Sequence, residues 1–154
     1  MFDLSPEELD TTGLEAALRR MLCQAADEYG FGFSVLGSLA APVAPDEAVV
    51  LFRVAREAVI NAGKHALASN VRITIATRDG GTAVAVEDDG VGIAAAATRG
   101  VEPGHVGLAR MRDRIALLGG RWAVEALPGA GTRVAFWLPT AEAEVDNACD
   151  VAAQ

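Results

Sequence analysis

Hydrophobic residues recur along the chain first at helical spacing and then at the spacing of a strand. Ser5-Pro6-Glu7-Glu8 is typical of a helix start, because it combines a capping residue, a proline at the first helical position and acids in the first turn. After Gly13, apolar residues continue at helical spacing until Gly30. The apolar and aromatic segment that follows, 31–39, predicts a strand.

A long amphipathic helix is predicted from Asp46 to about Leu67. At 100° per residue, one face is apolar and carries Leu51, Phe52, Ala55, Ala58, Val59, Ala62 and Ala66. The opposite face carries polar side chains, namely Arg53, Glu57, Asn61 and Lys64. The apolar face is expected in the core, and the polar face is either simply solvated or part of a site.

The second half of the chain predicts two strand pairs around a glycine-rich segment and a helix. The predicted elements are alternating strands at 71–76 and 83–87 around the turn Asp79-Gly80-Gly81, an aperiodic segment at 88–107, a helix from Leu108 to Gly119, and strands at 121–127 and 132–138. Strands and helices do not alternate regularly, as they would in a doubly wound fold. We therefore predict an α+β fold, a two-layer sandwich whose mixed, mainly antiparallel sheet has helices on one face.

Charge changes this picture by excluding one class of partner. The chain has 13 Lys and Arg against 21 Asp and Glu, a formal net charge of -8, whereas binding to phosphate backbones needs a basic surface. The excess acids lie before the first base, Arg19, and after the last, Arg133. We therefore expect no nucleic-acid partner, and a body that is close to neutral.

Membrane contact and disulfides are not predicted either. No apolar run approaches the roughly 20 residues that span a bilayer, and no secretion signal is visible at the N-terminus. Cys23 and Cys149 lie far apart and form neither a disulfide framework nor a metal knuckle. We expect a cytoplasmic, reduced protein.

Two glycine-containing segments have the composition of ligand-binding loops. In Asp88-Asp89-Gly90-Val91-Gly92, a carboxylate at a strand end can accept a hydrogen bond from an exocyclic amine, and the glycines allow backbone to approach a flat or anionic ligand. Gly104-His105-Val106-Gly107-Leu108 leads into a helix, where free N–H groups can receive phosphate. An ordinary turn and an ordinary loop-to-helix junction would explain each segment equally well.

The polar face of the long helix offers a third candidate group. Glu57 and Asn61 lie one turn apart and can share a catalytic water and a hard cation. Lys64 adds a positive charge for phosphate. An amide oxygen suits Mg²⁺, which takes few protein ligands and completes its shell with water and phosphate oxygens.

Taken together, these segments resemble the sequence boxes of the GHKL ATPases, and within them sensor histidine kinases of the NarX/DesK type. Residues 56–66 look like the N box, residues 86–93 like the G1 box, residues 104–114 like the G2 box and its helix, and residues 129–134 like the last turn and strand. The similarity covers about residues 46–139, and a linker-like stretch precedes it. It implies the Bergerat-type ATP-binding fold, with residues 1–45 as linker helix and first strand, 46–139 as catalytic core, and 140–154 as an acidic, disordered tail.

The resemblance also implies roles at both ends of a bound ATP. Asp88 would accept from the adenine N6 amino group, with Thr132 nearby. Asn61 would supply an oxygen to Mg²⁺, Lys64 would contact phosphate, and Glu57 would be the polar or general-base residue near the γ-phosphate. The G1 and G2 residues expected around the nucleotide are Gly90, Gly92, Gly104, Gly107 and Leu108.

The same resemblance implies partners. The family's phosphoacceptor is a histidine on an earlier helix, but the only histidines here, His65 and His105, lie inside the N and G2 boxes. We therefore expect a catalytic fragment that does not autophosphorylate alone and that acts on a separate dimerisation domain, with a response regulator downstream. The fragment is expected to be monomeric and the parent kinase to be a homodimer, and the resemblance is compatible with a parent kinase that is anchored in a membrane.

Two departures from the family pattern leave alternatives open. The lid segment 93–106 is short, rich in alanine and without a phenylalanine box, and the G2 spacing is G-x-x-G-L, which makes Gly104 less secure than Gly107. A stand-alone serine kinase of the anti-sigma-factor type uses the same fold at a similar length. A binding module that has lost turnover is the other alternative, against which the intact Glu57, Asn61 and Asp88 count.

Overall fold

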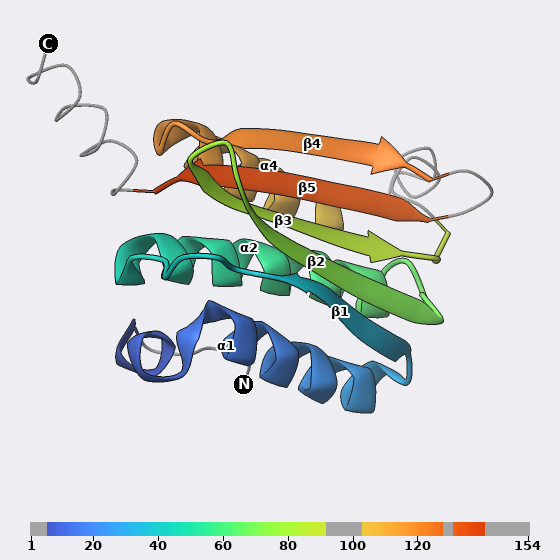
Figure 1. The fold of residues 1–154 in the computed structure, drawn as a ribbon. Coiled ribbons are helices and arrows are strands. Elements are labelled where there is room, and N and C mark those ends of the chain that lie inside the picture. Colours follow the sequence, from blue (N-terminus) through green and yellow to red (C-terminus); the bar gives the residue numbers. More distant parts are fainter. Residues whose placement is uncertain (1–5, 92–102, 128–130, 141–154) are drawn as a thin grey trace, which may run out of the picture.

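The computed structural model describes residues 6–91, 103–127 and 131–140 (Figure 1). In chain order the elements are α1 (Pro6–Tyr29), β1 (Gly32–Ser38), α2 (Pro45–Lys64), β2 (Asn70–Arg78), β3 (Gly81–Asp88), α4 (Pro103–Leu117), β4 (Arg121–Ala126) and β5 (Thr132–Pro139). Most of the predicted lid and the whole of the acidic segment after Thr140 lie outside the described residues.

The strands form one five-stranded sheet in the order β1-β2-β3-β5-β4. β1 is parallel to β2, and the other three pairings are antiparallel. In Figure 1 the sheet lies across α2 and α4, which cover the same face of it. The predicted α+β sandwich with a mixed, mainly antiparallel sheet is therefore confirmed.

Strand alternation decides which side chains face the helices. Val71, Ile73 and Ile75 in β2 are buried, whereas the residues between them are more exposed. In the pairing of β2 with β3, Ile73 lies opposite Val86 and Ile75 opposite Val84, and both partners are buried. These rows form the sheet side of the core, because side chains in the same register point to the same face.

α2 supplies the helix side of the core as its sequence pattern predicts. Its buried residues are Ala48, Leu51, Phe52, Val54, Ala55, Ala58, Val59 and Ala62. The helix ends at Lys64, earlier than Leu67, because Leu67 adopts a left-handed conformation with φ 53° and the His65 and Ala66 amides both donate to the Asn61 carbonyl. Ala66 therefore lies beyond the helix and is only half-buried, which corrects its predicted place on the apolar face.

The chain between Leu14 and α2 joins the same core. α1 has a break at Gly13, where φ is 79°, and after it Leu14, Leu18, Met21 and Leu22 are buried against the core. α1 packs on α2, and β1 extends the sheet next to β2. The segment that leads into the family-like region is thus integrated into the sandwich.

α4 begins earlier than its apolar pattern predicts. The predicted start is Leu108, but the helix already begins at Pro103, a residue that suits the first helical position. At the other end, Gly119 has φ 76° and the Gly120 amide donates to the Ile115 carbonyl, which is a glycine C-cap. The predicted stop at Gly119-Gly120 is confirmed.

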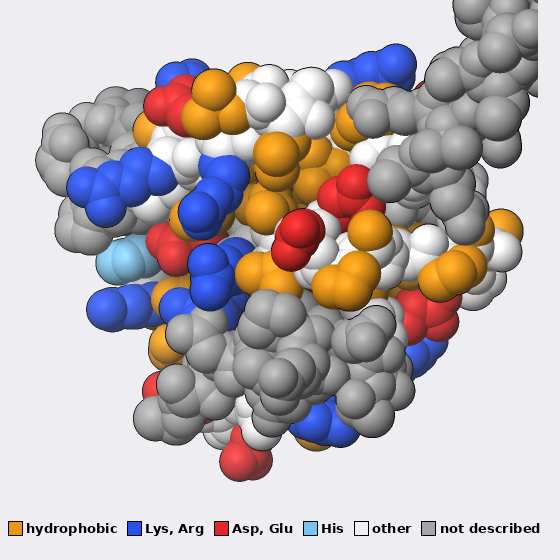
Figure 2. Space-filling model, turned by 90° about the vertical axis from the view of Figure 1, so that its left-hand side faces the viewer, with side chains coloured by type: hydrophobic (Ala, Val, Ile, Leu, Met, Phe, Trp, Pro, Cys, Tyr) orange, Lys and Arg blue, Asp and Glu red, His pale blue; other side chains and the backbone are white. Residues whose placement is uncertain are grey.

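Surface charge is mixed on the end of the molecule seen in Figure 2. Basic, acidic and hydrophobic side chains are interspersed there, with Lys and Arg gathered on the left of the view. On α4, Arg110, Arg112 and Arg114 are all exposed.

Among the residues that the structure describes, no helix combines the length and the hydropathy needed to cross a bilayer.

Candidate functional site

Asp88 and Thr132 are direct partners across β3 and β5. Their row lies two residues from Val86 and Val134, which are also paired and both buried, so Asp88 and Thr132 share the helix-facing side of the sheet. Thr132 is 4% exposed and Asp88 is half-buried. Two polar side chains therefore stand together at the end of a largely apolar face.

The Asp88 carboxylate is well placed to accept a hydrogen bond from a ligand. Its Oδ1 accepts from the Gly90 amide at 2.8 Å, which fixes the side chain. Burial raises the pKa of Asp88, and this effect outweighs the opposing Gly90 hydrogen bond. A desolvated carboxylate gains more from a donor such as an amino group than an exposed one does, because the surrounding dielectric is lower.

The loop after Asp88 is held against the segment that follows α2. The Val91 amide donates to the Ala66 carbonyl at 2.9 Å. A Cβ on Gly90 would lie 2.3 Å from that same carbonyl oxygen, so no larger residue fits there without a backbone shift. This close approach is the structural reason for a glycine at the first predicted G1 position.

Asp89 has three hydrogen bonds that the sequence did not reveal. Its Oδ1 accepts from the Ser69 amide at 2.7 Å and from the Asn70 amide at 2.8 Å, and its Oδ2 accepts from the Asn70 side-chain amide at 3.0 Å. The backbone amide of Asn70, then its side chain, hold the pKa of Asp89 below its usual range. The only signal in the sequence is a second carboxylate directly after Asp88.

Gly131 is another residue that sequence analysis left without a specific role at the site. It precedes Thr132 with φ 116°, and a Cβ there would lie 2.0 Å from the Asp88 carbonyl oxygen. The chain can therefore enter β5 next to Asp88 only through a glycine. The turn composition around residues 128–131 could have indicated this, since it is rich in glycine.

The polar stripe of α2 runs beside this end of the sheet. Glu57 and Asn61 are half-buried, and Lys64 is exposed at the last helical residue. Glu57 and Lys64 are seven residues apart, so they are separated by about 10 Å along the helix axis. They can therefore serve neighbouring groups of an extended ligand, but they do not converge on one atom.

α4 approaches α2 closely at Gly107. A Cβ on Gly107 would lie 2.1 Å from Glu57 Oε1, so the Glu57 carboxylate lies against the backbone of α4. Leu108, the next residue, is 6% exposed and belongs to the hydrophobic core. Its side chain therefore packs inward, and only its backbone is in a position to serve a ligand.

The remaining candidate glycines are less well defined. Gly104 lies in the first turn of α4, but its surroundings are outside the described part of the chain. Gly92 is outside the described residues altogether. Because α4 begins at Pro103, the unpaired N–H groups of its first turn precede Gly107.

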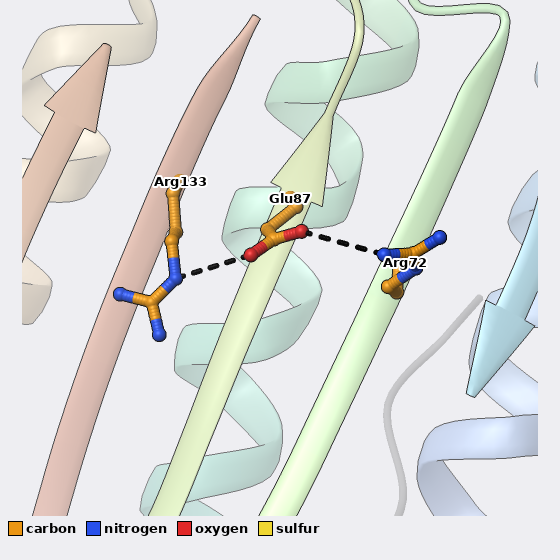
Figure 3. Close-up of polar contacts among 3 residues, drawn as sticks. All are labelled: Arg72, Glu87 and Arg133. Atoms are coloured by element: carbon orange, nitrogen blue, oxygen red, sulfur yellow. Dashed lines mark hydrogen bonds and ion pairs between the residues drawn. The ribbon is translucent and has the colours of Figure 1, made fainter. Parts of the chain in front are cut away.

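The opposite face of the sheet carries a separate set of charges. Glu87 accepts from Arg133 Nε at 3.1 Å and lies 4.0 Å from Arg72 Nη1 (Figure 3). In this view α2 lies behind the sheet, so the three side chains are on the side away from the helices. Adjacent residues of a strand point to opposite faces, which separates Glu87 from the Asp88 side chain.

Among the described residues, no group of three or more His, Cys, Asp or Glu could hold a metal ion. Mg²⁺ is commonly bound through one or two protein oxygens together with substrate phosphates. The amide oxygen of Asn61 has the right donor chemistry for such a site.

Comparison with known proteins shows the family and the fold of this chain. Residues 46–142 match the family described as histidine kinase-, DNA gyrase B- and HSP90-like ATPase. The nitrate/nitrite sensor protein NarX of Escherichia coli is 37% identical over 125 residues, which are 78% of this chain but only 20% of NarX. The sensor histidine kinase NarS of Mycobacterium tuberculosis is 30% identical over 139 residues, covering 90% of this chain and 32% of NarS.

A solved structure shows the same architecture. The ATP-binding domain of PrrB from Mycobacterium tuberculosis has a TM-score of 0.64 and 27% sequence identity, and the match covers 84% of this chain and 93% of that domain. The chain thus corresponds to one domain of its much longer sensor-kinase relatives.

Proposed function

This chain belongs to the histidine kinase-, DNA gyrase B- and HSP90-like ATPase family, and from that premise we propose that it is the ATP-binding catalytic domain of a sensor histidine kinase. Family membership implies ATP binding. The pairing of Asp88 with Thr132 on the helix-facing side of the sheet carries the proposal, since it supplies a desolvated acceptor for an amino group.

The proposal assigns the adenine end to Asp88. Its Oδ1 accepts from the Gly90 amide, which holds the carboxylate in place to accept from the N6 amino group. Thr132, one strand away, would contribute its hydroxyl to the same end. Gly90 and Gly92 would let the loop pass close to the nucleotide.

The phosphate end is assigned to α2 and α4. Asn61 would offer its side-chain oxygen to Mg²⁺, and Lys64 would contact phosphate. Glu57 would act as the polar or general-base residue beside the γ-phosphate, with Gly104, Gly107 and the Leu108 backbone shaping the wall. Bound Mg²⁺ would neutralise charge on the phosphates; the chain itself would mainly orient the transferring group.

The proposed reaction is transfer of the γ-phosphoryl group to a histidine on a separate dimerisation domain, with a response regulator downstream. Among the described residues His65 is half-buried beside the α2 C-terminus, and its backbone amide caps that helix. The sensor-kinase relatives favour this reaction over the alternative of an anti-sigma-type serine kinase. We further propose that the domain alone is monomeric and that a parent kinase forms the homodimer.

A substitution at Asp88 tests the nucleotide site. Asp88→Asn presents an amide donor or a weaker acceptor to the adenine amino group, so we expect Mg-ATP affinity to fall by roughly tenfold to a hundredfold, the worth of one hydrogen bond to a charged group. Asp79→Asn is the matched control, because Asp79 lies in the β2–β3 turn at the far end of the sheet. Calorimetric binding that survives Asp88→Asn would overturn the site.

A phosphotransfer assay tests the reaction. The domain is mixed with Mg-ATP and either a helical domain bearing an acceptor histidine or an anti-sigma antagonist. Acid-labile phosphohistidine on the first protein supports the proposal. Phosphoserine on the second would favour the alternative, and binding without transfer to either would indicate a module that has lost turnover.

A further inference from the structure

The loop that follows Asp88 is bound to the start of β2 by a carboxylate that the proposed nucleotide contacts do not use. Asp89 accepts from two consecutive backbone amides, Ser69 and Asn70, and from the side chain of Asn70. Ser69 is the last residue of the segment between α2 and β2, and Asn70 is the first residue of β2. One side chain therefore links the residue that follows β3 to the junction where the α2–β2 segment enters β2.

The backbone contacts alone would hold this loop less firmly. The Asp89 amide donates to the Asn70 carbonyl at 3.3 Å, which is long for such a bond, and the Val91 amide donates to Ala66 at 2.9 Å. The carboxylate contacts are shorter for the two amides, and bonds to an ionised acceptor are stronger than neutral ones. The Asp89 side chain thus adds three polar contacts directly after Asp88, where the backbone bond of the same residue is long.

The same segment is also joined to the first strand. The Gly32 amide donates to the Ser69 carbonyl at 2.8 Å, and a Cβ on Gly32 would lie 2.7 Å from Asn70 Oδ1. Ser69 and Asn70, which bind the Asp89 carboxylate, are therefore themselves held in place by β1. Because these two residues are fixed, their hydrogen bonds can also fix the position of Asp89, which hydrogen bonds to a freely moving loop could not do.

We infer that Asp89 is a positioning residue for nucleotide recognition, which sets where the Asp88 carboxylate stands relative to Asn61 and Lys64 on α2. The inference rests on the proposed function of the site. Asp88 binds the adenine amino group, and Asp89 holds the Asp88 carboxylate at the right distance from the residues that bind the phosphates. Loss of Asp89 should consequently weaken base discrimination more than phosphate binding.

The test compares ATP with purine riboside triphosphate, which lacks the 6-amino group but keeps the phosphates. In the unsubstituted chain ATP should bind more tightly. In Asp89→Ala we expect that preference to fall about fivefold to tenfold, with the affinity for purine riboside triphosphate nearly unchanged. A general loss of folding would lower the affinity for both nucleotides equally. The ratio of the two affinities therefore distinguishes a positioning role of Asp89 from an effect on stability.

Two further variants make the test robust to misfolding. Asp89→Asn keeps one acceptor oxygen for the Ser69 and Asn70 backbone amides, but it places its side-chain NH₂ group opposite the NH₂ group of Asn70, so that two donors face each other. In the double variant Asp89→Asn/Asn70→Asp, the side-chain hydrogen bond is restored with donor and acceptor exchanged. We expect the preference to be reduced in the single variant and recovered in the double one. Asp79→Asn, at the far end of the sheet, should leave it unchanged.

Amide hydrogen exchange of the nucleotide-free chain gives an independent measurement. Asp89→Ala should speed exchange at Ser69, Asn70 and Gly90 while leaving the core strands protected. An unchanged nucleotide preference in Asp89→Ala would overturn the inference while leaving the proposed function standing. Failure of the unsubstituted chain to bind ATP would overturn the proposed function, and this inference with it.

Discussion

The Glu57 carboxylate lies against the backbone of Gly107, so that a Cβ on this glycine would stand 2.1 Å from Glu57 Oε1. This contact joins the proposed general-base residue on α2 to α4. A residue of the N box and a residue of the G2 box, far apart in the chain, therefore share one point of the site.

Gly107→Ala should lower the rate of the proposed phosphotransfer without destabilising α4. The atom that the new Cβ meets is the far end of a flexible side chain, so Glu57 can rotate away, and alanine favours a helix by about 1 kcal/mol over glycine. We expect thermal unfolding to change little, while phosphotransfer to a supplied acceptor domain falls as the carboxylate moves. The double variant with Glu57→Asp, whose shorter side chain leaves room, should regain part of the rate. Unfolding at a much lower temperature would contradict this account.

Gly131→Ala should be far more damaging to folding. Its φ of 116° is unfavourable for an L residue, and the atom that the Cβ meets is the Asp88 carbonyl oxygen, which cannot rotate away. We expect a loss of about 3 kcal/mol or more in the free energy of unfolding. Gly119→Ala is the matched control, because it has φ 76° with nothing within 4 Å and should lose only about 1–2 kcal/mol. Urea denaturation of both variants measures the difference, and equal losses would contradict the steric argument.

Asp88→Asn should stabilise the fold at neutral pH while it weakens ATP binding. Burial raises the pKa of Asp88, so the folded chain holds this proton to a higher pH than the unfolded chain does. The group's contribution to the free energy of unfolding therefore falls as pH rises from the ordinary value of 3.8 through the folded pKa, and stays low above it. We expect a higher unfolding temperature for Asp88→Asn at pH 7, and a smaller difference well below 3.8. A lower unfolding temperature for Asp88→Asn at pH 7 would contradict this sign.

Glu87→Gln should leave nucleotide binding unchanged although Glu87 is the neighbour of Asp88. Its ion pairs with Arg72 and Arg133 lie on the face of the sheet away from the helices (Figure 3). These pairs are partly exposed, and such pairs contribute at most about 1 kcal/mol each. Urea denaturation and ATP calorimetry on Glu87→Gln, with Asp88→Asn alongside, test this division. A large loss of affinity in Glu87→Gln would show that the two faces are coupled.

The spacing of apolar residues along the chain was sufficient to predict most of the helices and strands, because this spacing follows directly from which side chains are buried. The apolar face of α2 and the alternation of Val71, Ile73 and Ile75 both lie in the core as predicted. Element ends were less predictable. Leu67 turns left-handed after α2, and α4 begins at Pro103 before any apolar repeat does, since an end depends on local backbone bonds more than on hydrophobic pattern.

For the candidate site, the sequence by itself determined the residue types and their order: a carboxylate with glycines at a strand end, a polar stripe on a helix, and glycines at the next helix. Only the tertiary structure decided which of them meet. Sheet register pairs Asp88 with Thr132, packing of α4 on α2 brings Gly107 to Glu57, and the junction of the α2–β2 segment with β2 presents two amides to Asp89. These contacts join residues far apart in the chain, so their geometry follows from how strands and helices pack and not from local spacing.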